Sequence, residues 1–242
     1  MDSTNIRNKF DILGKKIILI AILSLPFYGF GQKNVLENDL KFSRRAFHFG
    51  INMGVNTSDF KINRGDKFIY EDSISAIDAK SALGFNLAVL LSFHLSRHWE
   101  LRTLPGIAFQ DKKLDYQIYE GAPVSQNFNQ ILMEVPMHLK FKSDPIKDFK
   151  FYVFTGMKYS FDVASNSKAR NAEGIVKLNK HDIALDYGVG FEFHFPLFIL
   201  SPEFKVSNSF LNTHSYDPNL RFSNVIGALK NRAFFFGINF EG

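Results

Sequence analysis

The sequence predicts an all-β fold: an eight-stranded antiparallel up-and-down transmembrane β-barrel, preceded by a cleavable signal peptide. Three features of the 242 residues predict it. The chain opens with a basic stretch and a short apolar run. Eight later segments alternate large apolar residues with small or polar ones, and the links between these segments are long and short in turn. Strict alternation indicates strands with one apolar face, and the alternation of link lengths is typical of outer-membrane barrels.

The N-terminal residues 1–31 have the layout of a secretory signal peptide. Four basic residues precede the uncharged run IILIAILSLP at 17–26, and small residues end the segment at Gly31. The run is too short for a membrane-spanning helix, which needs about 20 residues. We therefore predict cleavage after Gly31, a periplasmic N-terminal segment at 32–45 and a barrel domain at 46–242. The alternative is a short N-terminal membrane anchor.

The composition excludes several classes of protein. With no cysteine, the chain has no disulfide framework, thiolate metal site or catalytic thiol. A net charge of +5, without a basic stripe, argues against a nucleic-acid partner. The chain has 28 phenylalanines but a mean hydropathy of only −0.09. A chain this aromatic and yet this polar must separate its two kinds of residue regularly.

The first four predicted strands show this separation with a period of two. Residues 47–55 (FHFGINMGV) and 83–93 (LGFNLAVLLSF) place bulky apolar residues at odd positions and small or polar ones at most even positions. Residues 99–109 (WELRTLPGIAF) and 131–141 (ILMEVPMHLKF) do the same, with charges on the even face. Because successive strand side chains point to opposite faces, each segment has one apolar face.

The last four predicted strands continue the pattern. They are residues 151–163 (FYVFTGMKYSFDV), 183–195 (IALDYGVGFEFHF), 198–206 (FILSPEFKV) and 234–240 (FFFGINF). In the eight segments the apolar face carries no charged residue, as a lipid-facing barrel wall requires. A soluble β-sandwich also alternates, and periodicity alone leaves that alternative open.

The links and the C-terminus favour a membrane barrel. The predicted links, which alternate long and short, are 56–82, 94–98, 110–130, 142–150, 164–182, 196–197 and 207–233. Outer-membrane barrels have short periplasmic turns and longer outer loops. An even number of strands then leaves both termini in the periplasm, and the aromatic Phe240 ends the last strand. We therefore predict a location in the outer membrane.

The charged face of the predicted strands should line the interior. Eight strands enclose a space that side chains just fill, and buried charges need partners. We therefore predict a structural network of lumen-facing charges, with a narrow ion or proton path as its functional alternative. The predicted network consists of Glu100, Arg102, Glu134, Lys140, Lys158 and Glu192.

Several stretches resemble a known family. Residues 32–38 (QKNVLEN) and 47–62 (FHFGINMGVNTSDFKI) resemble the start of the PorT family, called SprT in gliding bacteria, and residues 133–141 and 187–193 fit as well. That family consists of outer-membrane β-barrel proteins required by the type IX secretion system. The resemblance implies a non-enzymatic protein that supports export, with partners in the secretion apparatus. It carries over no catalytic or ligand-binding residue.

The residues themselves indicate little chemistry. We predict no catalytic, cofactor-binding or metal-binding residues and no cofactor, since no zinc motif is present. His94 and His98 lie four residues apart and could form a metal-binding pair, but a location in a turn suits them better. The expected partners are outer-membrane lipid, including lipopolysaccharide as an option, and proteins of the secretion apparatus, without nucleic acid. The alternatives are a generic small barrel for envelope integrity or surface adhesion, a lipid-acting outer-membrane enzyme, and a soluble lipocalin-like carrier.

Overall fold

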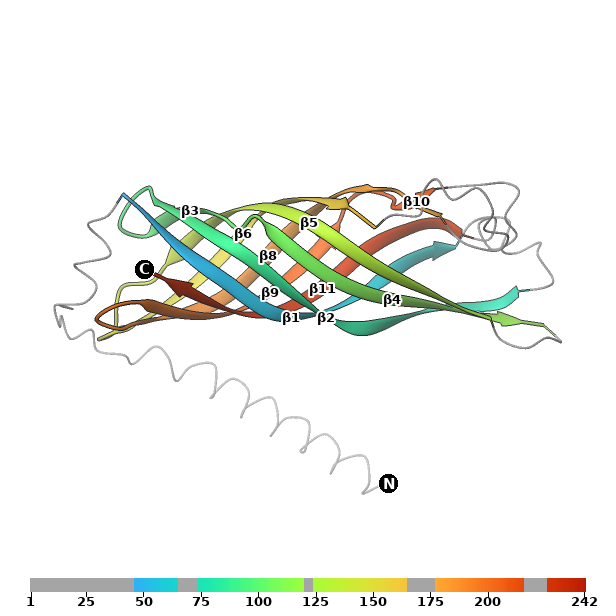
Figure 1. The fold of residues 1–242 in the computed structure, drawn as a ribbon, viewed down its shortest axis with the longest axis horizontal. Helices are drawn as coiled ribbons and strands as arrows, with labels where there is room; N and C mark the ends of the chain where they lie inside the picture. Colours follow the sequence, from blue (N-terminus) through green and yellow to red (C-terminus); the bar gives the residue numbers. More distant parts are fainter. Residues whose placement is uncertain (1–45, 65–73, 120–123, 165–176, 216–225) are drawn as a thin grey trace, which may run out of the picture. The chain divides into compact units, whose positions relative to one another are not determined.

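A computed structural model describes residues 46–64, 74–119, 124–164, 177–215 and 226–242 (Figure 1). The predicted signal peptide at 1–31 and the predicted periplasmic segment at 32–45 lie outside the described residues. The strands are β1 Phe47–Arg64, β2 Ile74–His94, β3 Trp99–Thr103, β4 Gly106–Ile118, β5 Val124–Lys142, β6 Phe149–Asp162, β7 Lys177–Leu178, β8 His181–His194, β9 Ile199–Ser209, β10 His214–Ser215 and β11 Ile226–Glu241. No helix among the described residues is long and apolar enough to cross a membrane.

Nine of the described strands form one closed antiparallel sheet, and β7 pairs with β10 in a separate two-stranded sheet. The predicted eight-stranded barrel is therefore confirmed. Around the ring, β1 pairs with β2, β2 with β3 and β4, and these with β5, followed by β6, β8, β9 and β11. The ring closes where β11 pairs with β1, from Gly50 opposite Glu241 outwards. The start of β1 and the C-terminus consequently lie at the same end of the barrel (Figure 1).

We call each of the eight strands of the barrel wall a stave. The third stave is interrupted and consists of two strands, β3 and β4, so nine strands form eight staves. β3 and β4 are separated by Leu104 and Pro105 and both pair with β2 and β5. Proline has no backbone N–H to donate to the ladder. Its carbonyl still accepts a hydrogen bond of 3.0 Å from the N–H of Val89, so the two pieces act as one stave.

The wall has an apolar outer face around most of its length, which we call the lipid belt. On β5 the outward residues from Ile131 to Phe141 are exposed and apolar, whereas their inward neighbours are buried. The other staves repeat this arrangement, with Phe85, Val189 and Phe236 each more than 40% exposed. Exposed apolar surface of this extent suits contact with lipid.

An aromatic residue marks each stave at the end of the barrel that carries the short turns. Trp99 lies against Phe141, with ring centroids 4.9 Å apart, and Phe195 stacks on Phe198 at 4.8 Å. The eight residues are Phe47, Phe93, Trp99, Phe141, Phe149, Phe195, Phe198 and Phe240. Aromatic girdles lie at the membrane–water interface of outer-membrane barrels, so this ring marks one edge of the belt.

At the opposite end the two faces of the wall exchange character. On β1 the outward residues change from Val55 to Asp59 and Lys61, while the inward Phe60 is buried. We call this part the outer extension: residues 57–64, 74–81, 111–118, 124–130 and 226–232. Inside it lies an apolar cluster, the apolar cap, made of Phe60, Ile77, Leu114, Tyr116, Phe128, Leu178, Ile226 and Leu229. The outer extension is therefore built like a water-soluble barrel.

The predicted limits of several strands were too short at this end. The described parts of the segments predicted as links at 56–82, 110–130 and 207–233 largely continue as strands β1, β2, β4, β5, β9 and β11. Strands β7 and β10 also pair with each other within the predicted links. The reason is the exchange of faces: outside the membrane, water favours polar residues on the outer face. A search for apolar outward residues therefore stops at the edge of the lipid belt.

A bulge in β2 helps the faces to exchange. The register with β4 shifts between Ser81 and Phe85. From Phe85 onward along the chain the outward residues of β2 have odd numbers, such as Phe85 and Leu87, whereas before Ser81 they have even numbers, such as Asp78 and Lys80. Gly84 lies in this stretch, where an added Cβ would stand 2.0 Å from the carbonyl oxygen of Phe109. The close approach of the two backbones requires glycine here.

Candidate functional site: the charged interior

The six charged residues predicted for the lumen all point into the barrel. β3 supplies Glu100 and Arg102, β5 supplies Glu134 and Lys140, β6 supplies Lys158 and β8 supplies Glu192. None of them is more than 7% exposed. Alternation places them there, because their outward neighbours occupy the lipid belt.

The interior holds more charge than the prediction included. The buried acidic residues are Glu100, Glu134, Asp162, Asp182, Asp186, Glu192, Glu203 and Glu241. The buried basic residues are Arg102, Lys112, Lys140, Lys142, Lys150, Lys158 and Lys205. Eight acidic groups thus face seven basic ones in the described part of the barrel, so the interior is nearly neutral.

Five of these charges lie outside the segments that the sequence pattern defined. Lys142, Lys150 and Glu241 stand one residue beyond a predicted strand end, as does Asp182, whereas Lys112 lies in the outer extension. Continuing the inward parity by one residue would have found the first four. Lys112 could not be found in this way, because the polar residues beside it conceal the strand.

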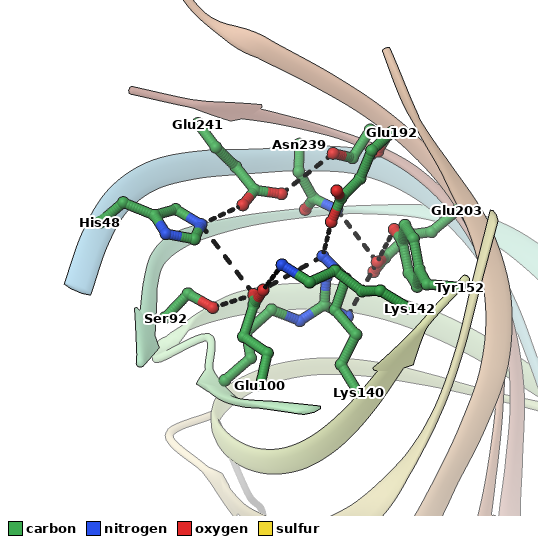
Figure 2. A network of polar contacts seen from close by, with 12 residues as sticks. His48, Ser92, Glu100, Lys140, Lys142, Tyr152, Glu192, Glu203, Asn239 and Glu241 are labelled. Atoms are coloured by element: carbon green, nitrogen blue, oxygen red, sulfur yellow. Dashed lines mark hydrogen bonds and ion pairs between the residues drawn. The ribbon is translucent and has the colours of Figure 1, made fainter. Parts of the chain in front are cut away.

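Glu100 is the centre of a cluster near the end with the short turns (Figure 2). Its carboxylate forms ion pairs with Lys142, at 2.5 Å, and with Lys140, at 3.6 Å. Ser92 donates a hydrogen bond to the same carboxylate. Two ammonium groups therefore compensate one fully buried carboxylate, which removes much of the cost of its burial.

Lys140 connects this cluster to β8, two strands farther around the ring. Its ammonium group lies 2.5 Å from Glu192 and 4.1 Å from the centre of the Tyr152 ring. Because β5 and β8 are not neighbours in the ring, the ion pair between Lys140 and Glu192 crosses the interior. Figure 2 shows both side chains within the same network as Glu100.

His48 and Glu241 join the first and last staves. Nε2 of His48 lies 2.5 Å from Oε2 of Glu241, and Ser201 donates a hydrogen bond of 3.0 Å to the other carboxylate oxygen. A second connection consists of amides: Asn86 donates to Asn52, and Asn52 donates to Asn239. The interior side chains thus reinforce the backbone pairing where the barrel closes.

Arg102 is fully buried in the interior and has both ionic and aromatic partners. Its Nη2 is 2.9 Å from Glu203, and its guanidinium group lies 4.8 Å from the centre of the Phe154 ring. Tyr152 also donates a hydrogen bond of 3.0 Å to Glu203. Gly188 and Gly190 make room for the rings, since an added Cβ would stand 2.7 Å from Phe154 and 2.3 Å from Tyr152, respectively.

Further pairs fill the interior toward the outer extension. Lys158 binds Glu134 at 2.8 Å, and Asp186 lies 3.1 Å from His138 and 3.5 Å from Lys205. Lys112 then donates hydrogen bonds of 2.7 Å to Gln130 and 2.8 Å to Asn231. The ammonium group of Lys112 also lies 4.8 Å from the Phe60 ring, so it connects the polar interior to the apolar cap.

The interior contains a small cavity with a mixed polar and apolar lining. It is lined by Gln110, Lys158, Ser160, Asp182, Ser207 and Asn231, among others, and has a volume of about 10 Å³. That is about the space that one water molecule needs. Through the described part of the barrel, side chains fill the space that a wide channel would occupy.

Among the described residues, His48, Glu100 and Glu241 form a group that could hold a metal ion. Their ligand atoms all lie within 4.8 Å of one another. However, Lys140 and Lys142 already place two positive charges beside Glu100, and a divalent cation would compete with both. The donor set fits a metal poorly for this reason, and we assign these residues to the charge network.

His94 and His98, the histidines of the possible metal pair, lie in different surroundings. His94 points to the interior, with Nε2 3.7 Å from Oε2 of Glu100. His98 lies in the turn, where its Nε2 is 3.3 Å from Asp144. The structure does not bring them together as one ligand set.

Comparisons with known proteins agree with the fold. A family model described as "Outer membrane protein beta-barrel domain" matches residues 30–215. No curated protein sequence matches the chain. Among solved structures, OprG from Pseudomonas aeruginosa is 15% identical, with a TM-score of 0.50, over 82% of this chain and 97% of that one. At this identity the likeness shows the fold alone.

Two further solved structures are similar over most of the barrel. Ail, the attachment invasion locus protein of Yersinia pestis, is 15% identical over 82% of this chain and 100% of that one, with a TM-score of 0.38. Neisserial surface protein A is 12% identical over 79% of this chain and 95% of that one, with a TM-score of 0.39.

Proposed function

Because the chain belongs to the outer membrane protein β-barrel domain family, we propose that it is a non-enzymatic component that supports type IX protein secretion from the outer membrane. The assignment to type IX secretion rests on the resemblance of residues 32–38 and 47–62 to the PorT and SprT proteins. In this proposal the barrel acts through its surfaces and does not conduct the exported protein.

The filled interior is the observation that carries this proposal. Arg102, Lys140 and Glu192 are each at most 2% exposed, and their ion pairs cross the lumen. An exported protein would have to displace these pairs and the apolar cap together. Breaking one buried ion pair typically costs about 3–5 kcal/mol, so displacing the network would cost a large part of a barrel's stability.

The surfaces left for partners are the outer extension, the lipid belt and the end with the short turns. We place the short turns and both termini in the periplasm, as is typical of outer-membrane barrels. The tips of these turns carry Leu95, Ile146 and Leu197, each at least 60% exposed. Exposed apolar side chains at three adjacent turns suit contact with a protein of the secretion apparatus.

A non-enzymatic role fits the state of the buried acidic groups. The carboxylates of Glu100, Glu192 and Glu203 each have a cationic partner within 3 Å. They are buried away from solvent and therefore poorly placed to meet a substrate. Assays of the purified barrel for lipid deacylation and proteolysis should show no turnover, and turnover lost in a variant of a rim residue would contradict this part of the proposal.

Deleting the gene tests the secretion role. We expect cargo of the type IX system to disappear from the cell surface and to accumulate in the periplasm. Complementation with the full chain should restore display. In planar bilayers the purified barrel should show little or no conductance, because the interior is filled.

Two results would contradict the proposal in different ways. Normal cargo display in the deletion strain would remove the secretion role and favour a generic small barrel with a role in envelope integrity or adhesion. Large, steady conductance would instead contradict the filled interior.

A further inference from the structure

The outer face of β1 and β11 carries an unbalanced group of positive charges just beyond the lipid belt. Lys61, Lys230 and Arg232 lie there with a single acidic neighbour, Asp59. Arg232 holds Asp59 through two hydrogen bonds, of 3.0 Å from Nε and 2.7 Å from Nη2. The two lysines are left with no acidic partner on this face, within the described residues.

The two lysines lie directly opposite each other. In the register of β1 and β11, Lys61 pairs with Lys230. The pairing of β1 with β2 ends at Ser58 and Ala82. Within the described part of the chain, β11 is therefore the one strand paired with β1 at Lys61. Like charges directly opposite each other destabilise a sheet. An anion bound between them would turn this repulsion into attraction.

The depth of the pair relative to the membrane suits a lipid headgroup. The guanidinium group of Arg232 lies 5.6 Å from the ring centre of Phe234, which belongs to the lipid belt. Lys230 and Lys61 are one outward-facing position farther along their strands. The headgroup layer is about 5–7 Å thick on each side of a bilayer, and a lysine side chain can reach back toward it.

The rim at β2 and β4 differs from this pair. On β2 and β4, Lys80 is 2.7 Å from Asp115, and Lys113 is 3.4 Å from the same carboxylate. Asp78 and Asp111 lie on the same outward face of these strands. The cations there are thus neutralised by the protein itself, and an added anion would be repelled.

We propose that Lys61 and Lys230 bind a phosphate group of a lipid headgroup, with Arg232 beside them. Since the loop end faces the outer leaflet in the proposed orientation, the lipid would be lipopolysaccharide; this identification rests on that orientation. The phosphate lies between the two ammonium groups, at the edge of the lipid belt. Contact there fixes the barrel's depth and attaches lipid to the seam between its first and last staves.

The test measures binding of lipopolysaccharide to the purified full-length barrel in detergent, by titration and by native mass spectrometry. The variant is Lys61→Gln/Lys230→Gln. The matched control is Lys80→Gln, which removes a rim cation that already has a carboxylate partner. Each cation near an anionic surface contributes about 1 kcal/mol, so we expect about 30-fold weaker binding for the double variant and less than 3-fold for the control.

Three ligands distinguish the source of the phosphate. Lipopolysaccharide stripped of its lipid A phosphates should bind the wild-type barrel as weakly as intact lipid binds the double variant. Inorganic phosphate below 1 mM should not compete, and phosphatidylglycerol vesicles should bind more weakly than lipopolysaccharide. Competition by inorganic phosphate, or equal binding of phosphatidylglycerol, would overturn the assignment to lipopolysaccharide.

Two further results would overturn the site itself. One is equal affinity of the wild type and the double variant, and the other is an equal loss in Lys80→Gln, which would indicate general surface charge. All variants should keep the heat-dependent gel shift of the folded barrel, because removing opposed like charges does not weaken the fold. These measurements use purified protein, so they are independent of whether cargo display fails in the deletion strain.

Discussion

Nη2 of Arg102 lies 2.9 Å from Oε2 of Glu203, in an ion pair that crosses the interior from β3 to β9 with side chains 0% and 5% exposed. These two strands are not neighbours in the ring. The pair therefore connects opposite sides of the wall, and its removal leaves a charge where water does not reach.

Arg102→Met should reduce the free energy of unfolding by about 3–5 kcal/mol, because Glu203 loses its buried partner. Urea unfolding in lipid vesicles, followed by the fluorescence of the single tryptophan, Trp99, measures it. Arg97→Met is the control: Arg97 is 75% exposed and pairs with Asp144, and such a pair is worth about 0–1 kcal/mol. Adding Glu203→Gln to Arg102→Met should recover part of the loss; equal effects of the Arg102 and Arg97 variants would contradict a buried network.

The edge of the lipid belt can be located by placing an arginine at two positions on the outer face of one strand. Val135 and Asn127 both lie on the outer face of β5 and are both exposed, but Val135 is in the belt and Asn127 in the outer extension. Val135→Arg should cost about 2–4 kcal/mol near the membrane midplane and Asn127→Arg about 0–1. Folding into vesicles of defined lipid measures both. Similar costs at the two positions would show that the belt ends elsewhere.

The apolar cap should behave like the core of a soluble protein. Leu229 is fully buried within it, whereas Leu197 is 86% exposed at a turn. Leu229→Ala should cost about 2–5 kcal/mol, since it leaves a cavity, and Leu197→Ala about 0.5 kcal/mol or less. The same unfolding measurement gives both values. A neutral Leu229→Ala would indicate that water fills the outer extension.

Asp115, in the outer extension and outside the membrane, should titrate at low pH. Hydrogen bonds from Lys80 and Ser125 lower the pKa of its carboxyl group to about 2, from about 3.9 in an unfolded chain. Because the folded-state pKa is the lower one, the stabilisation is complete above about pH 4 and is lost as the pH falls through about 2. The NMR chemical shift of the Asp115 carboxyl carbon, followed against pH in micelles, should show a higher titration midpoint in Lys80→Met than in Lys113→Met. An unchanged midpoint in Lys80→Met would contradict the assigned cause.

The orientation of the barrel can be tested without background labelling, because the chain contains no cysteine. A membrane-impermeant maleimide should label Asn127→Cys in intact cells. It should label Arg97→Cys, in the turn between β2 and β3, only after the outer membrane is permeabilised. The reverse pattern would place the short turns outside the cell.

The sequence by itself determined the eight staves, their faces and their order. The lipid belt imposes one rule on every strand, apolar outward and polar inward, and that rule is local enough to be read from the residues 131–141 or 183–195 alone. The same alternation rule also placed Glu100, Arg102 and Glu192 on the inner face, because a one-residue shift in strand register would expose them to lipid. The leader predicted at 1–31 remains a prediction.

The tertiary structure alone decided where the strands end and which charges meet. The exchange of faces beyond Val55 and Phe109 depends on where the membrane stops and water begins, which no local pattern records. The pairing of Arg102 with Glu203, and of Lys140 with Glu192, depends on the stagger that brings strands that are not neighbours in the ring to the same depth when the barrel closes. Glu241 became part of the network for the same reason: only closure of the ring brings it to His48.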